Sequence, residues 1–476
     1  MEETIVPKDL EQKIQHLFQL QKSNASNIAR TPANERIQKL RKLLDYNSKN
    51  IEKIQEAIFL DFKKHPSEVI IGELMGVNGE IKHLIKNLRT WMRPHKVPTP
   101  LNMFGTSAYV KFEPKGQCLI ISPWNYPFNL AIKPLAQAIA AGNTVILKPS
   151  ELTPNTSALI KEMLSGLFPE DEIAVIEGDA RVSTELLNLP FNHIFFTGSP
   201  QVGKIVMKAA SRHLASVTLE LGGKSPFIVD ETADIKTAGE KLAWGKFINA
   251  GQTCIAPDYV LVHKNVKSKL ISATVEATEK MFNPEAGGLE KTTDFSRIVN
   301  QRHFLRLKSL IEDALENGAS LVYGGETNAG DNYISPTILT GTEKAGRIMQ
   351  EEIFGPVLPI IEFEQNAEVI EKINAGEKPL ALYIHSRKRS NIDYFINNTS
   401  SGGVVINDVL IHYAHKELPF GGVNNSGIGK SGGIWGFTEF SNQKAVLKQR
   451  LNLFKMIYPP YTPRVKKLLG FLLKYV

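Results

Sequence analysis

The stretch QCLIISPWNYPFNLAIKPLAQAIAAGNTVILKPSE, residues 117–151, predicts the fold of this 476-residue chain. Its apolar runs CLII (118–121) and TVIL (144–147) have the length of buried strands, and the amphipathic stretch 128–141 separates them. A strand, a helix and a second strand in this order form a parallel β-α-β unit. The alternation continues through IAVIEG, HIFFTG and SVTLELGG, with amphipathic stretches at 154–167 and 200–213. The sequence therefore predicts an α/β fold with a Rossmann-like parallel sheet.

The segments on both sides of this block extend the prediction. Apolar residues at three- and four-residue spacing predict helices in segments 9–27, 33–62 and 66–92. The alternating stretch SAYVKFEP (107–114) predicts a strand with one wet face, which would form an arm rather than part of a core. A second alternation predicts another parallel-sheet domain, with strands near 226–230, 258–263, 358–362, 380–385 and 403–407. A short connection near 218–226 would join the two domains and leave a cleft where their strand ends meet.

Bulk composition excludes several classes of protein. Hydrophobic residues make up 42% of the chain and charged residues 22%, as in soluble globular proteins, which excludes a disordered or collagen-like chain. Two cysteines are too few for a disulfide framework or a cysteine zinc site, and they indicate a reducing compartment. The N-terminus MEETIVPKDLEQ lacks the apolar core of a secretory signal, and no run approaches the roughly 18–20 apolar residues of a membrane span. We therefore expect a cytoplasmic protein without a metal centre.

Cys254 is a candidate nucleophile, although a lone cysteine is more often a small core residue. It lies in NAGQTCIAPD, where Gly251 and Pro257 predict a turn that projects a side chain into a cleft. A thiolate there could attack a carbonyl carbon, and backbone amides of the turn could hold the resulting oxyanion. The other cysteine, Cys118, leads into the apolar run CLIIS, which favours a place in the core.

Asn125 and Glu220 are polar residues in surroundings that single them out. Asn125 lies in SPWNYPFN between Pro123 and Pro127, which fix the backbone and present a rigid amide. It is either an ordinary turn asparagine or an oxyanion donor, because an amide N–H donates without changing charge. Glu220 lies in TLELGGKSP, inside a run that otherwise indicates a buried strand. Burial would raise its pKa, which suits a general base, although a salt-bridged interior carboxylate fits this position equally well.

Two further segments have the features of a nucleotide site. Lys148 and Glu151, in LKPSE, lie at the end of the strand TVIL, where polar residues suit a ribose or a phosphate. The segment FFTGSPQVGK (195–204) passes from a strand through a glycine turn into a helix. Gly198 allows close approach of the backbone there, and the amides from Ser199 onward point to an anion at the helix N-terminus. The spacing is not GxGxxG, so the usual Rossmann fingerprint is absent.

All these segments together resemble one known family. In chain order they are SPWNYP, LKPSE, FFTGSPQVGK, LELGGKSP and GQTC, followed by EEIFGPV (351–357) and LPFGGVNNSGIG (418–429). The set closely resembles the aldehyde dehydrogenase superfamily over about residues 35–450. GQTCIAPDYV, the short N-terminal region and the tail with YPP are most similar to class 3, the fatty or medium-chain NAD(P)-dependent members. Members of this class more often have glycine in place of Asn424, which we expect at the wall of the substrate site, where it would affect substrate preference rather than reaction type.

The resemblance implies a catalytic role for three residues. Cys254 would be the nucleophile, Glu220 the general base, and Asn125 would share the oxyanion site with the backbone N–H of Cys254. The thiolate would add to an aldehyde, hydride would pass to the nicotinamide, and water activated by Glu220 would hydrolyse the thioester to an acid. Relatives that pass the acyl group to coenzyme A tend to lack this glutamate, so Glu220 favours hydrolysis over acyl transfer. A non-catalytic protein on an enzyme scaffold is a third alternative, and the intact trio weighs against it.

The resemblance likewise implies a site for NAD or NADP. Lys148 and Glu151 would hold the adenosine ribose, and Gly198 through Gly203 the pyrophosphate. Glu352 would hold the nicotinamide ribose, and Phe354 would pack near the nicotinamide. The remaining residues implied to contact the cofactor lie close to these in the sequence and are Trp124, Ser199, Leu221 and Gly222.

The resemblance also implies a domain plan and partners. Residues 1–220 would form the nucleotide-binding domain, with 95–115 contributing an oligomerisation arm, and residues 221–417 the catalytic domain. Residues 418–450 would return to the cofactor domain and supply an oligomerisation strand, and 451–476 would be a basic, apolar tail. The expected partners are a small-molecule aldehyde, medium- or long-chain aliphatic or aromatic, and a second copy of the chain in a homodimer.

The formal net charge of +7 is concentrated in the tail. Residues 444–476 include eight lysines and arginines and no aspartate or glutamate, so the rest of the chain is nearly neutral. A neutral body offers no electrostatic footprint for nucleic acid, and we expect none to bind. The segment VKKLLGFLLKYV (465–476) is too short to span a membrane. It either lies on an anionic membrane surface, where each basic residue contributes about 1 kcal/mol, or packs on its own dimer.

Overall fold

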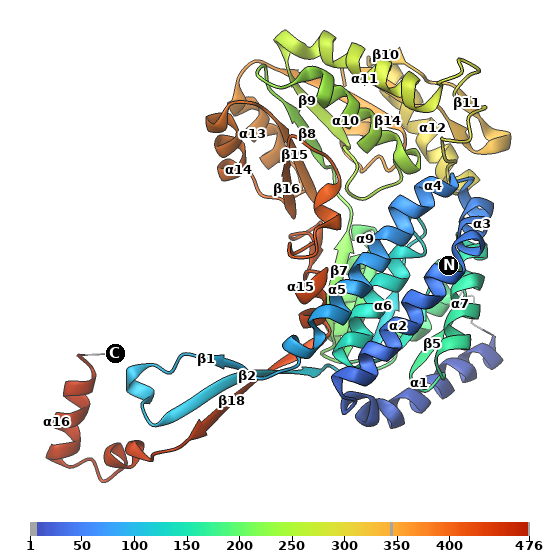
Figure 1. The fold of residues 1–476 in the computed structure, drawn as a ribbon. Coiled ribbons are helices and arrows are strands. Elements are labelled where there is room, and N and C mark those ends of the chain that lie inside the picture. Colours follow the sequence, from blue (N-terminus) through green and yellow to red (C-terminus); the bar gives the residue numbers. More distant parts are fainter. Residues whose placement is uncertain (1–6, 343–345, 475–476) are drawn as a thin grey trace.

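The computed structural model describes residues 7–342 and 346–474, which form two α/β lobes and a projecting arm (Figure 1). Each lobe is built around its own predominantly parallel sheet, one of six strands and one of seven. The predicted α/β class with two parallel sheets is confirmed. Residues 222–225 make the direct connection between the two sheets, from the end of β7 at Leu221 to the start of β8 at Pro226.

The six-stranded sheet contains the stretch that predicts the fold. Its strand order is β17-β7-β6-β3-β4-β5, and every neighbouring pair is parallel except β17–β7. The predicted strands are found as β3 (Gln117–Ile121), β4 (Thr144–Lys148), β5 (Ile173–Val175), β6 (His193–Gly198) and β7 (Ser216–Leu221). The predicted helices between them are α6 (Asn129–Ala141), α7 (Pro154–Leu167) and α9 (Pro200–Ser211), while α8 (Ala180–Leu187) and β17 (Gly427–Ile428) are additional.

Successive residues of β3 point to opposite faces of this sheet, as strand geometry requires. Cys118 and Ile120 belong to the core under the N-terminal helices, which confirms the predicted place of Cys118. Leu119 and Ile121 belong to the core on the other face, together with apolar residues of α1 (Lys8–Ala29) and α9. Both faces are therefore covered, which explains why the strands read as continuous apolar runs.

The N-terminal helices confirm most of the predicted pattern and correct one segment. Segment 33–62 forms two helices, α2 (Ala33–Lys49) and α3 (Ile51–Phe62), rather than one. The break lies at Asn50, which leaves helical geometry with φ −123° and donates from its side chain to the carbonyl of Tyr46 at 2.9 Å. Asparagine side chains that bond to nearby backbone groups are unfavourable in a helix interior, which agrees with a helix boundary at this residue. Segment 66–92 forms α4 (Pro66–Val69), the π-helix η1 (Ile70–Leu74) and α5 (Met75–Trp91).

The seven-stranded sheet forms the second lobe. Its order is β10-β13-β14-β9-β8-β15-β16, parallel apart from the edge strand β10. Its strands are β8 (Pro226–Val229), β9 (Tyr259–His263), β10 (Ser320–Tyr323), β13 (Thr337–Thr340), β14 (Val357–Phe363), β15 (Ala381–His385) and β16 (Gly403–Ile406). Its main helices are α10 (Ile235–Phe247), α11 (Lys267–Phe282), α12 (Gln301–Glu316), α13 (Asn366–Ala375) and α14 (Arg389–Asn398). The five strands predicted between 226 and 407 are all present.

The arm extends away from both lobes (Figure 1). It is a three-stranded antiparallel sheet of β1 (His95–Val97), β2 (Thr106–Pro114) and β18 (Ser441–Gln449), with β2 in the middle. The predicted strand at 107–114 is thus confirmed. Helix α15 (Gly433–Glu439) leads into β18, and the short helix α16 (Pro463–Leu472) lies beyond the arm with no buried side chain. The last two residues of the predicted tail lie outside the described residues.

Candidate active site

A cavity of about 710 Å³ collects most of the predicted site residues. It is lined by Cys254, Asn125 and Glu220, and by seven of the residues predicted to contact the cofactor: Trp124, Gly198, Ser199, Leu221, Gly222, Glu352 and Phe354. The first sheet supplies residues at the ends of β3, β6 and β7, and the second lobe supplies the cysteine turn and the 348–354 segment. The carboxyl ends of parallel strands therefore meet the second lobe at one cleft, as the topology predicts.

Cys254 lies in a tight turn after α10. The turn contains three consecutive residues with positive φ, namely Asn249 at 54°, Ala250 at 50° and Gly251 at 73°. A Cβ at Gly251 would lie 2.3 Å from the carbonyl oxygen of Gly355, so only glycine fits there. Burial, followed by the nearby carboxylates of Glu352 and Glu220, raises the pKa of the Cys254 thiol to about 12. The thiol therefore stays protonated near neutral pH until a base removes its proton.

Asn125 lies beside this turn and is tied to it. Its side-chain Nδ2 donates to the carbonyl of Gln252 at 3.1 Å, and its own carbonyl accepts from Nδ2 of Asn249 at 2.9 Å. The side chain is buried, with 3% of its surface exposed. One N–H of the amide donates to Gln252, so the side chain has a second N–H to donate, and Asn125 lines the same cavity as Cys254.

Glu220 is the penultimate residue of β7 and is almost fully buried. Burial raises the pKa of its carboxyl group above the ordinary value, and the charge of Lys133 and a hydrogen bond from Ser431 oppose this rise. Oε1 of Glu220 accepts that bond from the Ser431 hydroxyl. The expected burial and the expected direction of the pKa shift are both confirmed. A carboxylate with a raised pKa at the edge of a cavity has the properties of a general base.

The glycine turn after β6 brings the start of α9 to the cavity. Gly198 and Ser199 line the cavity, and the Ser199 hydroxyl caps α9 by accepting from the backbone N–H of Val202 at 3.4 Å. Three predicted cofactor residues do not line this cavity. Gly203 faces the packed side of α9, where a Cβ would lie 2.8 Å from Leu221. The other two, Lys148 and Glu151, form an ion pair of 2.7 Å at the end of β4.

Glu352 and Phe354 form the opposite wall. A Cβ at Gly222 would lie only 2.0 Å from Oε2 of Glu352, so the carboxylate packs directly on the bare backbone. Burial raises the pKa of Glu352 to about 8, and the backbone N–H of Gly223, which donates to the carboxylate, opposes this rise. Phe354 has a positive φ of 51°, and its ring meets the ring of Trp124 edge-on at 5.3 Å between centroids.

The sequence reasoning missed the charged groups that hold the 348–354 segment. Lys224 donates to the carbonyls of Ile348 at 2.8 Å and Glu351 at 2.9 Å, and also to Asp258. Asp258 in turn accepts from the backbone N–H of Ile353 at 2.8 Å. A signal for both residues existed, because Lys224 follows the double glycine of LELGGKSP and Asp258 ends GQTCIAPD.

Arg306 was also missed, and its helix gives no comparable motif. It donates to the carbonyls of Glu352 at 3.3 Å and Ile353 at 2.5 Å. Asn424, the position where glycine is more common, does not line the cavity. It has a positive φ of 55° and accepts from Lys378 at 2.9 Å, while the neighbouring Asn425 does line the cavity.

The residues present fit a dinucleotide. A helix N-terminus with a preceding glycine suits a pyrophosphate, the Lys148–Glu151 pair lies at a strand end where a ribose binds, and the bare backbone of Gly222 leaves room beside Glu352. Among residues 7–342 and 346–474, no group of three or more His, Cys, Asp or Glu side chains is placed to hold a metal. The same residues include no helix with the length and apolar character needed to cross a membrane.

Two predominantly parallel sheets thus share a cleft lined by a cysteine thiol, a side-chain amide and a buried carboxylate. The chain belongs to the aldehyde dehydrogenase family, whose model matches residues 4–446. It is 45% identical over 419 residues to 4,4'-diaponeurosporen-aldehyde dehydrogenase of Staphylococcus aureus (strain NCTC 8325 / PS 47), with 88% of this chain and 90% of that one covered. It is 40% identical over 466 residues to aldehyde dehydrogenase family 3 member B3 of Mus musculus, with 96% and 94% covered.

A solved structure supports the same assignment. The substrate-bound state of Staphylococcus aureus AldH matches with a TM-score of 0.92 at 42% identity, covering 96% of this chain and 99% of that chain. The predicted resemblance to class 3 is therefore confirmed. Solved neighbours at 26% identity hold NADP, and the cofactor of this chain is NAD or NADP.

Proposed function

We propose that this enzyme oxidises medium- or long-chain aliphatic, or aromatic, aldehydes to carboxylic acids through a thioester on Cys254. The observation that carries the proposal is that Cys254, Asn125 and Glu220 line one cavity together with Glu352 and Phe354. A nucleophile, an oxyanion donor and a base thus lie beside the residues assigned to the nicotinamide end of the cofactor. We also propose that residues 1–220 bind the nucleotide and that residues 221–417 supply the nucleophile.

Each of the three residues has a step that its surroundings suit. The Cys254 thiol, once deprotonated, attacks the aldehyde carbon, and the amide of Asn125 donates to the oxygen that becomes negative. Glu352 and Phe354 would hold the nicotinamide end of the cofactor, which would supply the hydride acceptor. Glu220 then removes a proton from the water that attacks the thioester carbonyl, and its raised pKa makes it a better base than an exposed glutamate. The acid departs and the thiol is restored.

Cys254→Ala tests the proposal directly. The variant should fold with a normal melting temperature and lose NADH or NADPH formation, while retention of normal turnover would refute the role of the thiol. A panel of aliphatic aldehydes of increasing chain length plus benzaldehyde, run with both cofactors, tests the substrate class. The absence of reduced cofactor across the whole panel would favour the non-catalytic alternative.

Hydrolysis is favoured over acyl transfer because Glu220 is present at the edge of the cavity. The free acid should therefore form at the same rate with and without coenzyme A. A product that requires coenzyme A would instead identify an acyl-transferring enzyme. Analysis of the product by mass, with both conditions run on one preparation, separates the two reactions.

A homodimer is supported by surfaces that a single chain leaves uncovered. β18 is an edge strand of the arm and exposes Leu447, and α9 exposes Val202 and Ile205 beside the cavity. An exposed edge strand with apolar residues is a template for pairing with another chain. Sedimentation of the full chain should give the mass of a dimer, and deletion of the residues that form β18 should give a monomer. A monomeric wild-type chain would refute this part of the proposal.

We also propose that the tail contacts a membrane surface, the alternative being that it packs on its own dimer. Helix α16 buries none of its side chains, and Leu473 beyond it is 78% exposed. Lysines next to leucine and phenylalanine suit the surface of an anionic bilayer. Full-length protein should bind vesicles containing phosphatidylserine and lose binding in high salt. Unchanged binding after deletion of residues 459–476 would exclude this role.

A further inference from the structure

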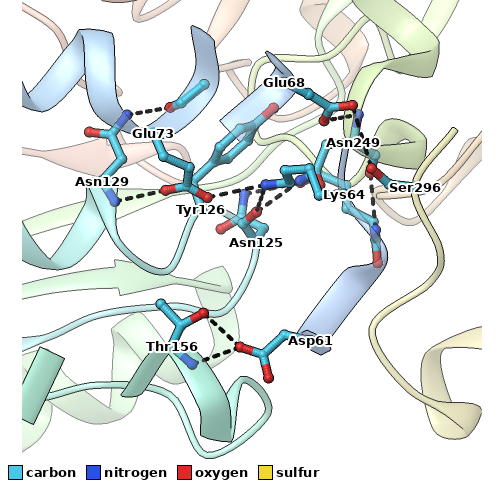
Figure 2. Close-up of polar contacts among 12 residues, drawn as sticks. Asp61, Lys64, Glu68, Glu73, Asn125, Tyr126, Asn129, Thr156, Asn249 and Ser296 are labelled. Carbon is cyan, nitrogen blue, oxygen red and sulfur yellow. Dashed lines mark hydrogen bonds and ion pairs between the residues drawn. The ribbon is translucent and has the colours of Figure 1, made fainter. Parts of the chain in front are cut away.

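Lys64, Glu68 and Glu73 form a buried charged cluster next to Asn125 (Figure 2). Lys64 and Glu73 have no exposed surface, and Glu68 is 9% exposed. Charged side chains are almost never buried so completely unless they are paired. Removing such charges from water costs several kcal/mol per ion, so a buried pair is weak evidence for stability. A contribution to stability therefore does not explain why this cluster is buried next to Asn125.

The ammonium group of Lys64 lies against the loop that carries Asn125. Its Nζ lies 3.1 Å from Oε1 of Glu73 and donates to the main-chain carbonyl of Asn125 at 3.4 Å. It also lies over the ring of Tyr126, 4.4 Å from the centroid, where a cation is attracted by the aromatic face. The positive charge thus contacts two successive residues of the loop, one of which is the proposed oxyanion donor.

Glu73 fixes the other end of the same loop. Its second oxygen, Oε2, accepts from the backbone N–H of Asn129 at 2.8 Å. The adjacent Gly72 accepts from the Asn129 side chain at 2.8 Å, and a Cβ on Gly72 would lie 2.8 Å from the Tyr126 ring. Both belong to the π-helical turn η1, a local departure from the α-helix that is frequent at functional sites. The loop from 125 to 129 is therefore held at its two ends by Lys64 and Glu73.

Glu68 holds the turn that precedes Cys254. Its Oε1 accepts from the backbone N–H of Asn249 at 2.9 Å, at the first residue of the turn with positive φ. Asn249 then donates from its side chain to the carbonyls of both Asn125 and Gln252, at 2.9 and 3.1 Å. The carbonyl of Asn125 consequently accepts one bond from the cluster and one from the cysteine turn (Figure 2).

We propose that Lys64 is a positioning residue for the oxyanion site, which fixes the main chain of Asn125 so that its amide stays next to Cys254. The inference rests on the proposed function, because it assigns Lys64 a purpose through Asn125 and Cys254. Lys64 acts through Asn125 and contacts no reacting atom. A misplacement of about 1 Å in a reacting geometry costs about a hundredfold in rate, so loss of Lys64 should lower kcat about tenfold to a hundredfold.

Two variants separate positioning from the stability of the fold. Lys64→Met removes the charge and keeps the length of the side chain, but leaves Glu73 buried without its partner. The double variant Lys64→Met with Glu73→Gln removes both charges and keeps an acceptor for the N–H of Asn129. The matched control is Lys39→Met, which breaks the 2.7 Å ion pair between Lys39 of α2 and Glu172, neither of which lines the cavity. For each protein, kcat, KM for NAD, the dissociation constant of NADH and the melting temperature are measured.

Positioning predicts that the double variant recovers most of its melting temperature while kcat stays about tenfold to a hundredfold low and the NADH dissociation constant stays within twofold. Lys39→Met should keep wild-type kcat. Recovery of kcat together with the melting temperature in the double variant would overturn the inference, as would a folded Lys64→Met with kcat within twofold of wild type. The aldehyde panel is run on the same wild-type preparation, and Cys254→Ala is assayed beside it. No reduced cofactor across the panel, or normal turnover of Cys254→Ala, would refute the proposed function itself, independently of any result at Lys64.

Discussion

Gly222→Ala should separate the stability of the fold from the use of the cofactor. The Cβ of an alanine at this position would lie 2.0 Å from Oε2 and 2.5 Å from Oε1 of Glu352. Such atoms do not approach within 3.0 Å, so the carboxylate must move by about 1 Å. The group that moves is the free end of a flexible side chain, and the φ of Gly222 lies outside the left-handed region that would strain an alanine. We therefore expect the melting temperature to change by only a few degrees.

The expected loss appears in the reaction instead. If Glu352 holds the nicotinamide ribose, a displacement of about 1 Å shifts the reacting end of the cofactor by a similar amount. A misplacement of this size costs about a hundredfold in rate, and each tenfold corresponds to 1.36 kcal/mol, so the barrier should rise by about 2.7 kcal/mol. We expect kcat/KM for NAD to fall by about this factor at saturating aldehyde.

The neighbouring glycine supplies the control. A Cβ at Gly223 would have its nearest neighbours at 3.4 Å, the backbone N of Leu380 and Cα of Pro379, which is ordinary contact. Gly223→Ala should therefore keep kcat/KM for NAD within about threefold of wild type, and its N–H still reaches Glu352. The reasoning is refuted if Gly222→Ala retains wild-type kcat/KM, or if the two alanine variants lose activity equally.

Three further variants test the other parts of the site. Glu220→Gln should lower steady-state turnover by about 10²–10⁴-fold and keep the first burst of NADH, as measured by rapid mixing, because thioester hydrolysis is the step assigned to this base; loss of the burst would show instead that Glu220 also deprotonates Cys254. Since burial raises the pKa of Glu220 and the base must be ionised, wild-type turnover should fall with decreasing pH at a midpoint above that of an exposed glutamate. Asn125→Ala should lower kcat about 10²–10³-fold with little change in KM for NAD, whereas a change confined to KM would point to cofactor binding. The folded chain retains a proton on Glu352 up to a pKa of about 8, against an ordinary value of 4.5, so the free energy of unfolding of the cofactor-free enzyme should fall as pH rises between these values, and Glu352→Gln should flatten that slope in denaturant titrations.

Much of this site could be predicted because its residues lie at the ends of strands. Glu220 comes at the end of an apolar run, Asn125 shortly after one, and Cys254 in a glycine turn, so local patterns made all three candidates, while the family resemblance supplied their roles. The predicted topology then places residues at these strand ends near one cleft, since the carboxyl ends of parallel strands share one edge of a sheet. The break at Asn50 was not predictable in the same way. Segment 33–62 keeps a helical pattern throughout, and the helix is interrupted where Asn50 leaves helical geometry and its side chain also donates to the carbonyl of Tyr46.

The buried cluster at Lys64 shows a different limit of local patterns. In the sequence, KKHPSEVIIGELMG looks like charged residues around the start of a helix, where solvated lysines and glutamates are usual. These charges are buried by segments far along the chain, since Lys64 meets Asn125 across 61 positions and Glu68 meets Asn249 across 181. The spacing of residues within this segment could not predict partners so far along the chain. The motifs SPWNYP and GQTC contain the groups proposed to react, and under the inference for Lys64 the distance between those groups depends on a third segment that contains none of them. It follows that two chains with the same motifs can differ in the accuracy of their oxyanion sites, and that the difference should be sought at positions 64, 68 and 73.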